Sequence, residues 1–172
     1  MPPIHPAIVH FPIALLVLSV IADFFGFLYQ SESLRGAGWW SLFGAAIGGA
    51  LAVAAGLYDM KREEEKIKHK AHEQVHKHMY VGFVLLAAIA GLTVWRWLIY
   101  ANQDYDLNWV YLILAFLIVF LAFFQGWLGG ELVFGYGVGV APTGQGTEPP
   151  KEAQKRVAEV IGGRGEEDKH SH

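Results

Sequence analysis

The stretch GAGWWSLFGAAIGGALAVAAGLY, residues 36–58, contains no charged side chain along its whole length. About 22 apolar residues are enough for an α-helix to cross the roughly 30 Å hydrocarbon layer of a membrane. Hydrophobic and polar residues do not alternate in it, as they do in the strands of a membrane barrel. Because only helices and closed barrels satisfy the backbone in lipid, this stretch predicts a transmembrane helix.

Three further stretches have the same length and composition: 6–29, 79–100 and 107–129. Asp23 and Arg96 are the only charged residues in them. Tryptophans lie close to the ends of the predicted spans, as in the aromatic belts of membrane proteins: Trp39, Trp40, Trp95, Trp97, Trp109 and Trp127. We therefore predict an all-α integral membrane protein, folded as an antiparallel four-helix bundle that contacts the lipid bilayer.

The composition excludes several classes of function. The chain has 172 residues, of which 53% are hydrophobic and 17% are charged, and the charged fraction is low for a soluble domain. A net charge of −3 without a polybasic run gives no support for nucleic-acid binding. The absence of cysteine excludes disulfides, thiolate catalysis and iron–sulfur clusters, so a metal site would need histidine, carboxylate or tyrosine ligands.

Four crossings place both termini and the loop 60–78 on one membrane face, which we name side A, and the two shorter connections on side B. The loop carries six basic residues: Lys61, Arg62, Lys66, Lys68, Lys70 and Lys77. Side B has only Arg35 and Arg96. The positive-inside rule therefore predicts that side A, with both termini, is cytoplasmic.

The segments outside the spans differ in composition. The loop 60–78 lacks proline and glycine, so we expect it to extend the third span as a helix into the cytoplasm. GGELVFGYGVGVAPTGQG, residues 129–146, is too rich in glycine for a helix interior and predicts an ordered loop. Residues 1–141 then form the membrane domain. Residues 142–172 form a soluble tail, with one amphipathic helix at 148–161 and a disordered end.

All eight histidines fall on side A. On a helix, His69, His72 and His76 lie within a sector of roughly 60°, and His78 points to the opposite side. His72 and His76 have the i, i+4 spacing at which two side chains can share one metal ion. We expect His69 and His78 to be solvated, as is usual for histidines in a lysine-rich loop.

The peptide HPAIVHFPIALL, residues 5–16, carries two more histidines at the start of the first span. His10 lies one turn inside the span, where an unpaired polar group is costly, so we expect it to be buried as a ligand or hydrogen-bonded. Pro12 lacks the amide that the carbonyl of Ile8 would accept from, which predicts a kink beside His10.

Two other features have simple interpretations. The spacing of Gly44 and Gly48 in the second span favours tight helix packing over a cofactor lying on the smooth face. Asp23 lies nearer side B, where Arg35, Arg96, a serine or a tyrosine is available as its partner. We interpret Asp23 as an interfacial carboxylate.

Four motifs occur in a fixed order: HPAIVHFPIAL at 5–15, Gly56 and Asp59 at the end of the second span, a histidine entering the third, and GGELVFGYGVGV at 129–140. Over residues 3–141 the chain resembles the bacterial and archaeal family of predicted four-span membrane proteins called domain of unknown function 2231. The resemblance implies four helices in a prokaryotic inner (plasma) membrane and a shared site on side A, without a settled activity. A histidine often stands in that family where this chain has Tyr136, which weakens any role that requires an imidazole there.

These observations leave three hypotheses open. The favoured one is a non-covalent b-type haem for electron transfer, ligated by His10 and His76, with Asp59 as an acceptor for a ligand's ring N–H. The second is a non-haem Zn, Cu or Fe site that uses His5, His10, His72 and His76, with Asp59 and Tyr136 as oxygen donors. The third is a cofactor-free subunit or scaffold, either a homo-oligomer or part of a larger redox or membrane complex.

None of the three hypotheses makes the protein an enzyme, because the sequence contains no nucleophile–base–acid set and no phosphate-binding loop. Transport by this chain alone is the least favoured, because the spans lack a series of ionisable groups near the midplane.

Overall fold

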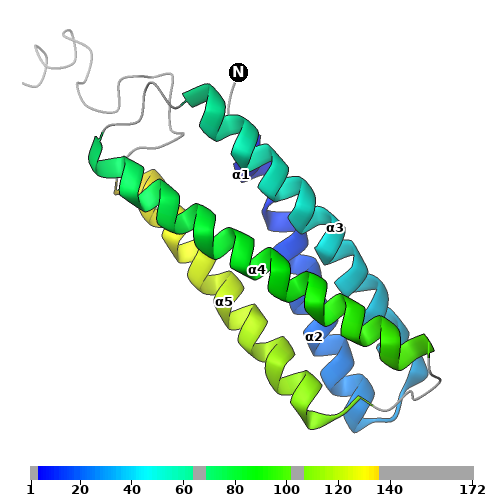
Figure 1. The fold of residues 1–172 in the computed structure, drawn as a ribbon. Coiled ribbons are helices and arrows are strands. Elements are labelled where there is room, and N and C mark those ends of the chain that lie inside the picture. The colour runs from blue at the N-terminus through cyan, green and yellow to red at the C-terminus, as the bar shows by residue number, and fades with distance from the viewer. Residues whose placement is uncertain (1–3, 64–68, 102–106, 136–172) are drawn as a thin grey trace, which may run out of the picture.

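A computed structural model describes residues 4–63, 69–101 and 107–135 of the chain. These residues form the helices α1 (His5–Ile8), α2 (His10–Leu28), α3 (Glu32–Glu63), α4 (His69–Ala101) and α5 (Trp109–Phe134), as Figure 1 shows. The described part contains no strand. Tyr136, the predicted tail and its helix at 148–161 lie outside the described residues. The all-α prediction is confirmed for the residues that are described.

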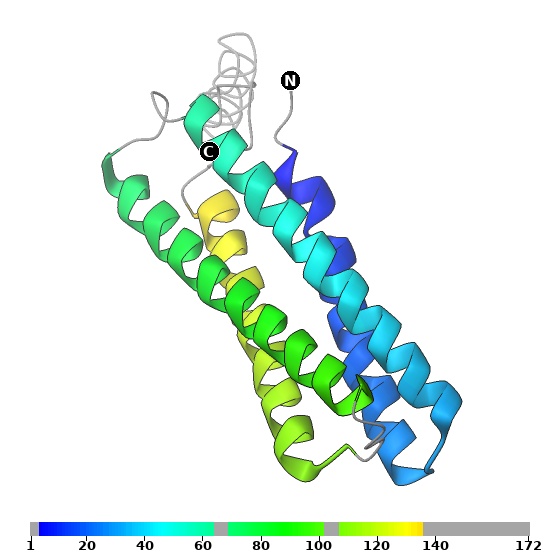
Figure 2. The same cartoon turned by 45° about the vertical axis from the view of Figure 1, so that its right-hand side comes forward.

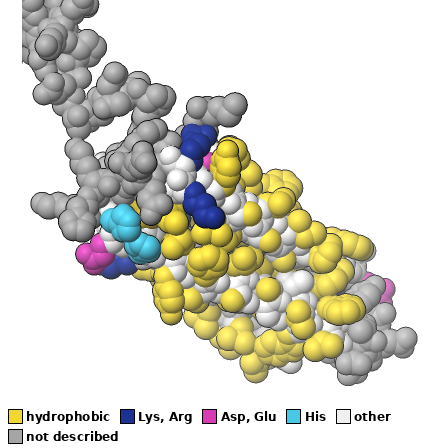
Figure 3. Space-filling view, turned by 45° about the horizontal axis from the view of Figure 1, so that its top comes forward, with side chains coloured by type: hydrophobic (Ala, Val, Ile, Leu, Met, Phe, Trp, Pro, Cys, Tyr) yellow, Lys and Arg dark blue, Asp and Glu magenta, His cyan; other side chains and the backbone are white. Residues whose placement is uncertain are grey.

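Four helical stretches are long and apolar enough to cross a membrane: His5–Leu28, Glu32–Arg62, His72–Ile99 and Trp109–Phe134. Large hydrophobic side chains are exposed along the length of the bundle, while Lys, Arg and His side chains gather at one end of the face shown in Figure 3. Trp40, Trp97, Trp109 and Trp127 are each more than half exposed. An exterior of this kind suits contact with lipid.

The first span is interrupted close to the predicted kink. α1 ends at Ile8 and α2 begins at His10, because Pro12 has no amide hydrogen to donate to the carbonyl of Ile8. Val9 itself still donates to the carbonyl of His5 and accepts from the amide of Ile13. Val9 nevertheless keeps helical dihedral angles, φ −61° and ψ −28°. The chain therefore continues from α1 into α2 as one span.

Helices α3, α4 and α5 extend beyond the spans predicted for them. α4 begins at His69, so the charged residues 69–78 are helical, as the predicted helical extension of the third span requires. The prediction that an ordered loop begins at Gly129 was wrong, because α5 continues to Phe134. Each interior glycine costs a helix about 1 kcal/mol, but burial of Leu128 and Leu132 offsets this penalty. Gly129 also leaves room for His78, since a Cβ there would lie 3.2 Å from Cε1 of that ring.

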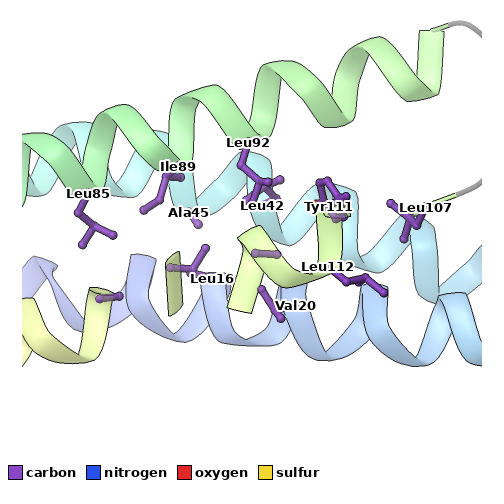
Figure 4. Packing of buried hydrophobic residues seen from close by; sticks show 12 residues of the cluster. Leu16, Val20, Leu42, Ala45, Leu85, Ile89, Leu92, Leu107, Tyr111 and Leu112 are labelled. Atoms are coloured by element: carbon purple, nitrogen blue, oxygen red, sulfur yellow. The ribbon is translucent and has the colours of Figure 1, made fainter. Parts of the chain in front are cut away.

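The core is a cluster of apolar side chains contributed by α2, α3, α4 and α5, part of which Figure 4 shows. Helices α2 and α3 lie side by side in both ribbon views (Figures 1 and 2). A Cβ added at Gly44 would lie 2.9 Å from Leu15, and one added at Gly48 would lie 3.1 Å from Pro12. The small residues of α3 thus allow close approach of α2, so tight packing was the correct interpretation of their spacing.

Candidate functional site

The start of the first span is fixed by a buried carboxylate. Oδ2 of Asp59, on α3, accepts hydrogen bonds from the backbone amides of Ile4 at 2.7 Å and His5 at 2.8 Å. Asp59 is only 8% exposed. It satisfies two amide donors that the first turn of a helix leaves free, and it thereby holds α1 against α3 at side A.

The ring of His5 is held in one tautomer. Its Nδ1 lies 2.7 Å from the carbonyl oxygen of Ala52, which can only accept, so Nδ1 donates the hydrogen bond. In the neutral ring, Nε2 then carries a lone pair and no proton. A Cβ at Gly56 would lie 3.0 Å from Nδ1, so the glycine makes room for the ring. A ring N–H bonded to a carbonyl is the usual orientation of a metal-ligating histidine.

The ring of His78, on α4, faces the ring of His5 at the side-A end of the bundle. The two ring centres are 6.0 Å apart and the rings are perpendicular. Nε2 of Gln125, on α5, donates to the carbonyl oxygen of His78 at 2.9 Å and lies 3.2 Å from Nε2 of the His78 ring. Helices α1, α3, α4 and α5 therefore each contribute a polar side chain to this cluster. We name His5, Asp59, His78 and Gln125 the side-A cluster.

Three buried atoms of the side-A cluster have no hydrogen-bond partner among the described residues: Oδ1 of Asp59, Nδ1 of His78 and Oε1 of Gln125. An unsatisfied buried polar atom costs roughly 1–3 kcal/mol, and more when it is charged. The three atoms belong to residues that contact one another in series, Asp59 with His5, His5 with His78 and His78 with Gln125. The donor set, two imidazoles with carboxylate and amide oxygens, is one that transition metals accept.

The other predicted site residues lie elsewhere. His10 is exposed, contrary to the expectation that it is buried. His72 and His76 are also exposed, and their ring centres are 4.7 Å apart. The structure thus brings together His5 and His78, and separately His72 and His76, instead of one shared set. Among the described residues, no group of three or more His, Asp or Glu side chains is placed to hold a metal ion.

Sequence reasoning missed two members of the side-A cluster. The helical geometry correctly placed His78 opposite His72 and His76, but the face of α4 that points inward is the one that carries His78. Apart from Asn108 at its start, the predicted span 107–129 contains one amide side chain, Gln125, and a polar group inside a span needs a partner. The need of Gln125 for a hydrogen-bond partner could therefore have identified it from the sequence as a site residue.

A second polar cluster lies at side B. Asp23 is fully buried and Arg96 is 2% exposed. Nη2 of Arg96 donates to Oδ1 of Asp23 at 3.1 Å and to the carbonyl oxygen of Arg35 at 3.1 Å, and the hydroxyl of Tyr111 donates to Oδ2 of Asp23 at 2.9 Å. The predicted partner Arg96 is confirmed, and Asp23 lies inside the bundle instead of on its surface. We name Asp23, Arg35, Arg96 and Tyr111 the side-B cluster.

The side-B cluster ties four helices together. Asp23 is on α2, Arg35 on α3, Arg96 on α4 and Tyr111 on α5. Nε of Arg35 also donates to the carbonyl oxygen of Gly26 at 3.2 Å. Gly38 leaves room for the carboxylate, because a Cβ there would overlap the side chain of Asp23. This arrangement satisfies both oxygens of Asp23 and suits a structural ion pair.

One protein family has a sequence profile that matches residues 1–142, and its description is predicted membrane protein (DUF2231). The chain belongs to the DUF2231 family. The match covers every described helix, so the predicted membrane character of DUF2231 proteins agrees with the four apolar helices. Neither the curated proteins nor the solved structures include a match to the chain.

Proposed function

We propose that this DUF2231 protein is an antiparallel four-helix protein of the prokaryotic inner membrane that binds a transition metal on its cytoplasmic side through His5 and His78. The observation that carries the proposal is the bond from Nδ1 of His5 to the carbonyl of Ala52, which leaves the Nε2 lone pair free beside a second imidazole. The tautomer is selected before any metal binds. Little reorganisation of His5 is then required.

The spacing of the two rings fits a shared metal. A metal–nitrogen bond of about 2.0–2.1 Å puts the metal roughly 3.2 Å from a ring centre, so the centres of two ligating rings lie between roughly 4.5 Å apart at a right angle and roughly 6.4 Å apart on opposite sides of the metal. The ring centres of His5 and His78 are separated by 6.0 Å. Oδ1 of Asp59 and Oε1 of Gln125, which are buried without a partner among the described residues, are acceptors left over in the same cluster.

The metal is carried either as a bare ion or as haem iron, since both bind imidazole. Haem would be non-covalent, because the chain has no cysteine, and would make the protein an electron carrier. His10 and His76, the pair predicted from sequence, have exposed rings and are therefore less suited to hold haem than His5 and His78. An absorption spectrum distinguishes haem iron from a bare ion, because only haem gives a Soret band.

The test is metal analysis and an absorption spectrum of detergent-purified protein from cells supplied with haem, zinc, copper and iron. We expect a stoichiometric metal, or a Soret band, in the parent protein and its loss in His5→Ala and His78→Ala. His10→Ala and His76→Ala serve as matched controls and should retain it. Loss of the metal only in the two control variants would overturn the assignment, as would metal-free, colourless parent protein.

A cofactor-free subunit of a larger membrane complex is the second candidate. Among the described residues, no group of three or more His, Asp or Glu side chains is placed to hold a metal ion, so this candidate needs a test of its own. The same purification provides it, because a stoichiometric protein partner without metal or colour would support this candidate. A homo-oligomer would appear in that experiment as a larger particle composed of one chain.

A further inference from the structure

The first two turns of α4 carry a pair of histidines that the side-A cluster does not use. His72 and His76 are both exposed, and their ring centres lie 4.7 Å apart with the ring planes tilted by 50°. They are one helical turn apart and share a face of α4. His78 lies on the opposite face and points into the bundle, so the two sets of imidazoles are separated by the helix itself.

The separation of these rings suits two ligands at adjacent positions on one ion. With the metal roughly 3.2 Å from each ring centre, right-angle and tetrahedral arrangements put the centres roughly 4.5 and 5.2 Å apart. The observed 4.7 Å lies between these values. Because the helix backbone already holds the two side chains together, the pair loses little conformational freedom when it binds.

The neighbouring charged side chains leave the histidines accessible. Glu73 and Lys77, each one position further along α4, form their own i, i+4 ion pair at 2.8 Å. Both of these side chains are more than half exposed. Glu73 and Lys77 have the same i, i+4 spacing as the histidines on the adjacent face of α4. Substitution of this ion pair is therefore a matched control for substitution of the histidine pair.

We propose that His72 and His76 form an exchangeable two-histidine site for a divalent transition metal ion, separate from the side-A cluster. Imidazole nitrogen favours Cu²⁺, Ni²⁺ and Zn²⁺, and the Irving–Williams order places Cu²⁺ first and Mn²⁺ last. Two protein ligands leave the remaining coordination positions to water. Such a site takes up and releases an ion readily instead of enclosing it.

The test is titration of the full chain, purified in detergent without a polyhistidine tag, with Cu²⁺ and then with Zn²⁺ and Mn²⁺. The parent for these titrations carries His5→Ala, His78→Ala, His170→Ala and His172→Ala, so that neither the side-A cluster nor the terminal histidines contribute. We expect one Cu²⁺ per chain, with nitrogen hyperfine splitting in its electron paramagnetic resonance spectrum. Zn²⁺ should bind more weakly, and Mn²⁺ should not bind.

His72→Ala and His76→Ala should each weaken Cu²⁺ binding by at least roughly 10-fold, as expected for loss of a ligand. The double variant Glu73→Ala/Lys77→Ala should leave the affinity unchanged. The sharpest variant is His76→Ala/Lys77→His, which keeps two histidines but turns them roughly 140° apart around the helix. If that variant binds Cu²⁺ as tightly as its parent, the shared site is wrong, and weakening comparable to His76→Ala supports it. A parent without bound Cu²⁺ would also refute the proposal.

Discussion

The buried carboxylates at the two ends of the bundle differ in how many of their oxygens accept hydrogen bonds. At side B, both oxygens of Asp23 receive hydrogen bonds, from Arg96 and from Tyr111. At side A, Asp59 uses one oxygen to accept two backbone amides and leaves the other buried without a partner among the described residues. Of the four unsatisfied buried side-chain atoms in the described part, three belong to the side-A cluster and one, Nε of Arg96, to side B.

The difference separates a structural role from a binding role. A polar network that is nearly satisfied specifies how helices pack, and its loss leaves an uncompensated charge inside the protein. Polar groups that are held in place but left unsatisfied reduce stability and are retained where they bind something. The comparison therefore predicts that substitutions at side B change mainly folding, and that substitutions at side A change mainly ligand binding.

The largest effect is expected from breaking the side-B ion pair. Asp23→Ala removes the charge that faces Arg96, which is 2% exposed, and should lower the free energy of unfolding by about 3–5 kcal/mol. The measurement is reversible unfolding of the purified protein in mixed detergent micelles.

The control for this experiment is the double variant Asp23→Leu/Arg96→Leu, which removes both charges and replaces them with apolar side chains. It should recover most of the lost stability, because no buried charge remains unpaired. A loss below about 1 kcal/mol in Asp23→Ala, or a double variant no more stable than the single one, would contradict a structural role for the pair.

A smaller effect is expected from filling the space that the ion pair needs. Gly38→Ala would place a methyl group against the carboxylate of Asp23 and should cost about 1–3 kcal/mol. Gly36, two residues earlier in α3, has no atom within 4 Å of an added Cβ. Gly36→Ala should therefore be neutral or gain up to about 1 kcal/mol from helix propensity. Thermal unfolding of the two variants side by side measures the difference, and equal stability would mean that the contact with Asp23 is not restrictive.

The fold was largely predictable from the sequence. Long uncharged stretches such as residues 36–58 leave the backbone few alternatives to a helix in lipid. The end of α5 was mispredicted because Gly129 and Gly130 suggested a loop, whereas Gly129 serves to accommodate His78. Composition alone does not distinguish a glycine that ends a helix from one that makes room for a neighbour.

The candidate site was less predictable because it depends on the rotation of each helix. The i, i+4 spacing correctly placed His72 and His76 on one face of α4 but contains no information about whether that face points inward. His5 and Asp59 were identified as candidates, and the contact that joins them is a backbone one, which residue types do not reveal. The partner of His78 is Gln125, 47 positions away along the chain, and only the packing of α4 against α5 brings them together.

The smallest effect on stability, and the most informative, is expected at Asp59. Asp59→Asn keeps one oxygen to accept the amides of Ile4 and His5 and replaces the unsatisfied oxygen with an NH₂ group. The free energy of unfolding should change by less than about 1 kcal/mol, because the bonds that hold α1 are retained. Metal retained through His5 and His78 should nevertheless fall by roughly 10- to 100-fold, the usual consequence of changing a group that orients or completes a metal site. The two quantities are measured on the same preparation, by unfolding and by metal analysis after dialysis against a chelator.

A loss of several kcal/mol with full metal retention would make Asp59 equivalent to Asp23 and remove the distinction between the two ends. A stable variant that loses its metal would support binding as the reason why side A keeps polar atoms unsatisfied.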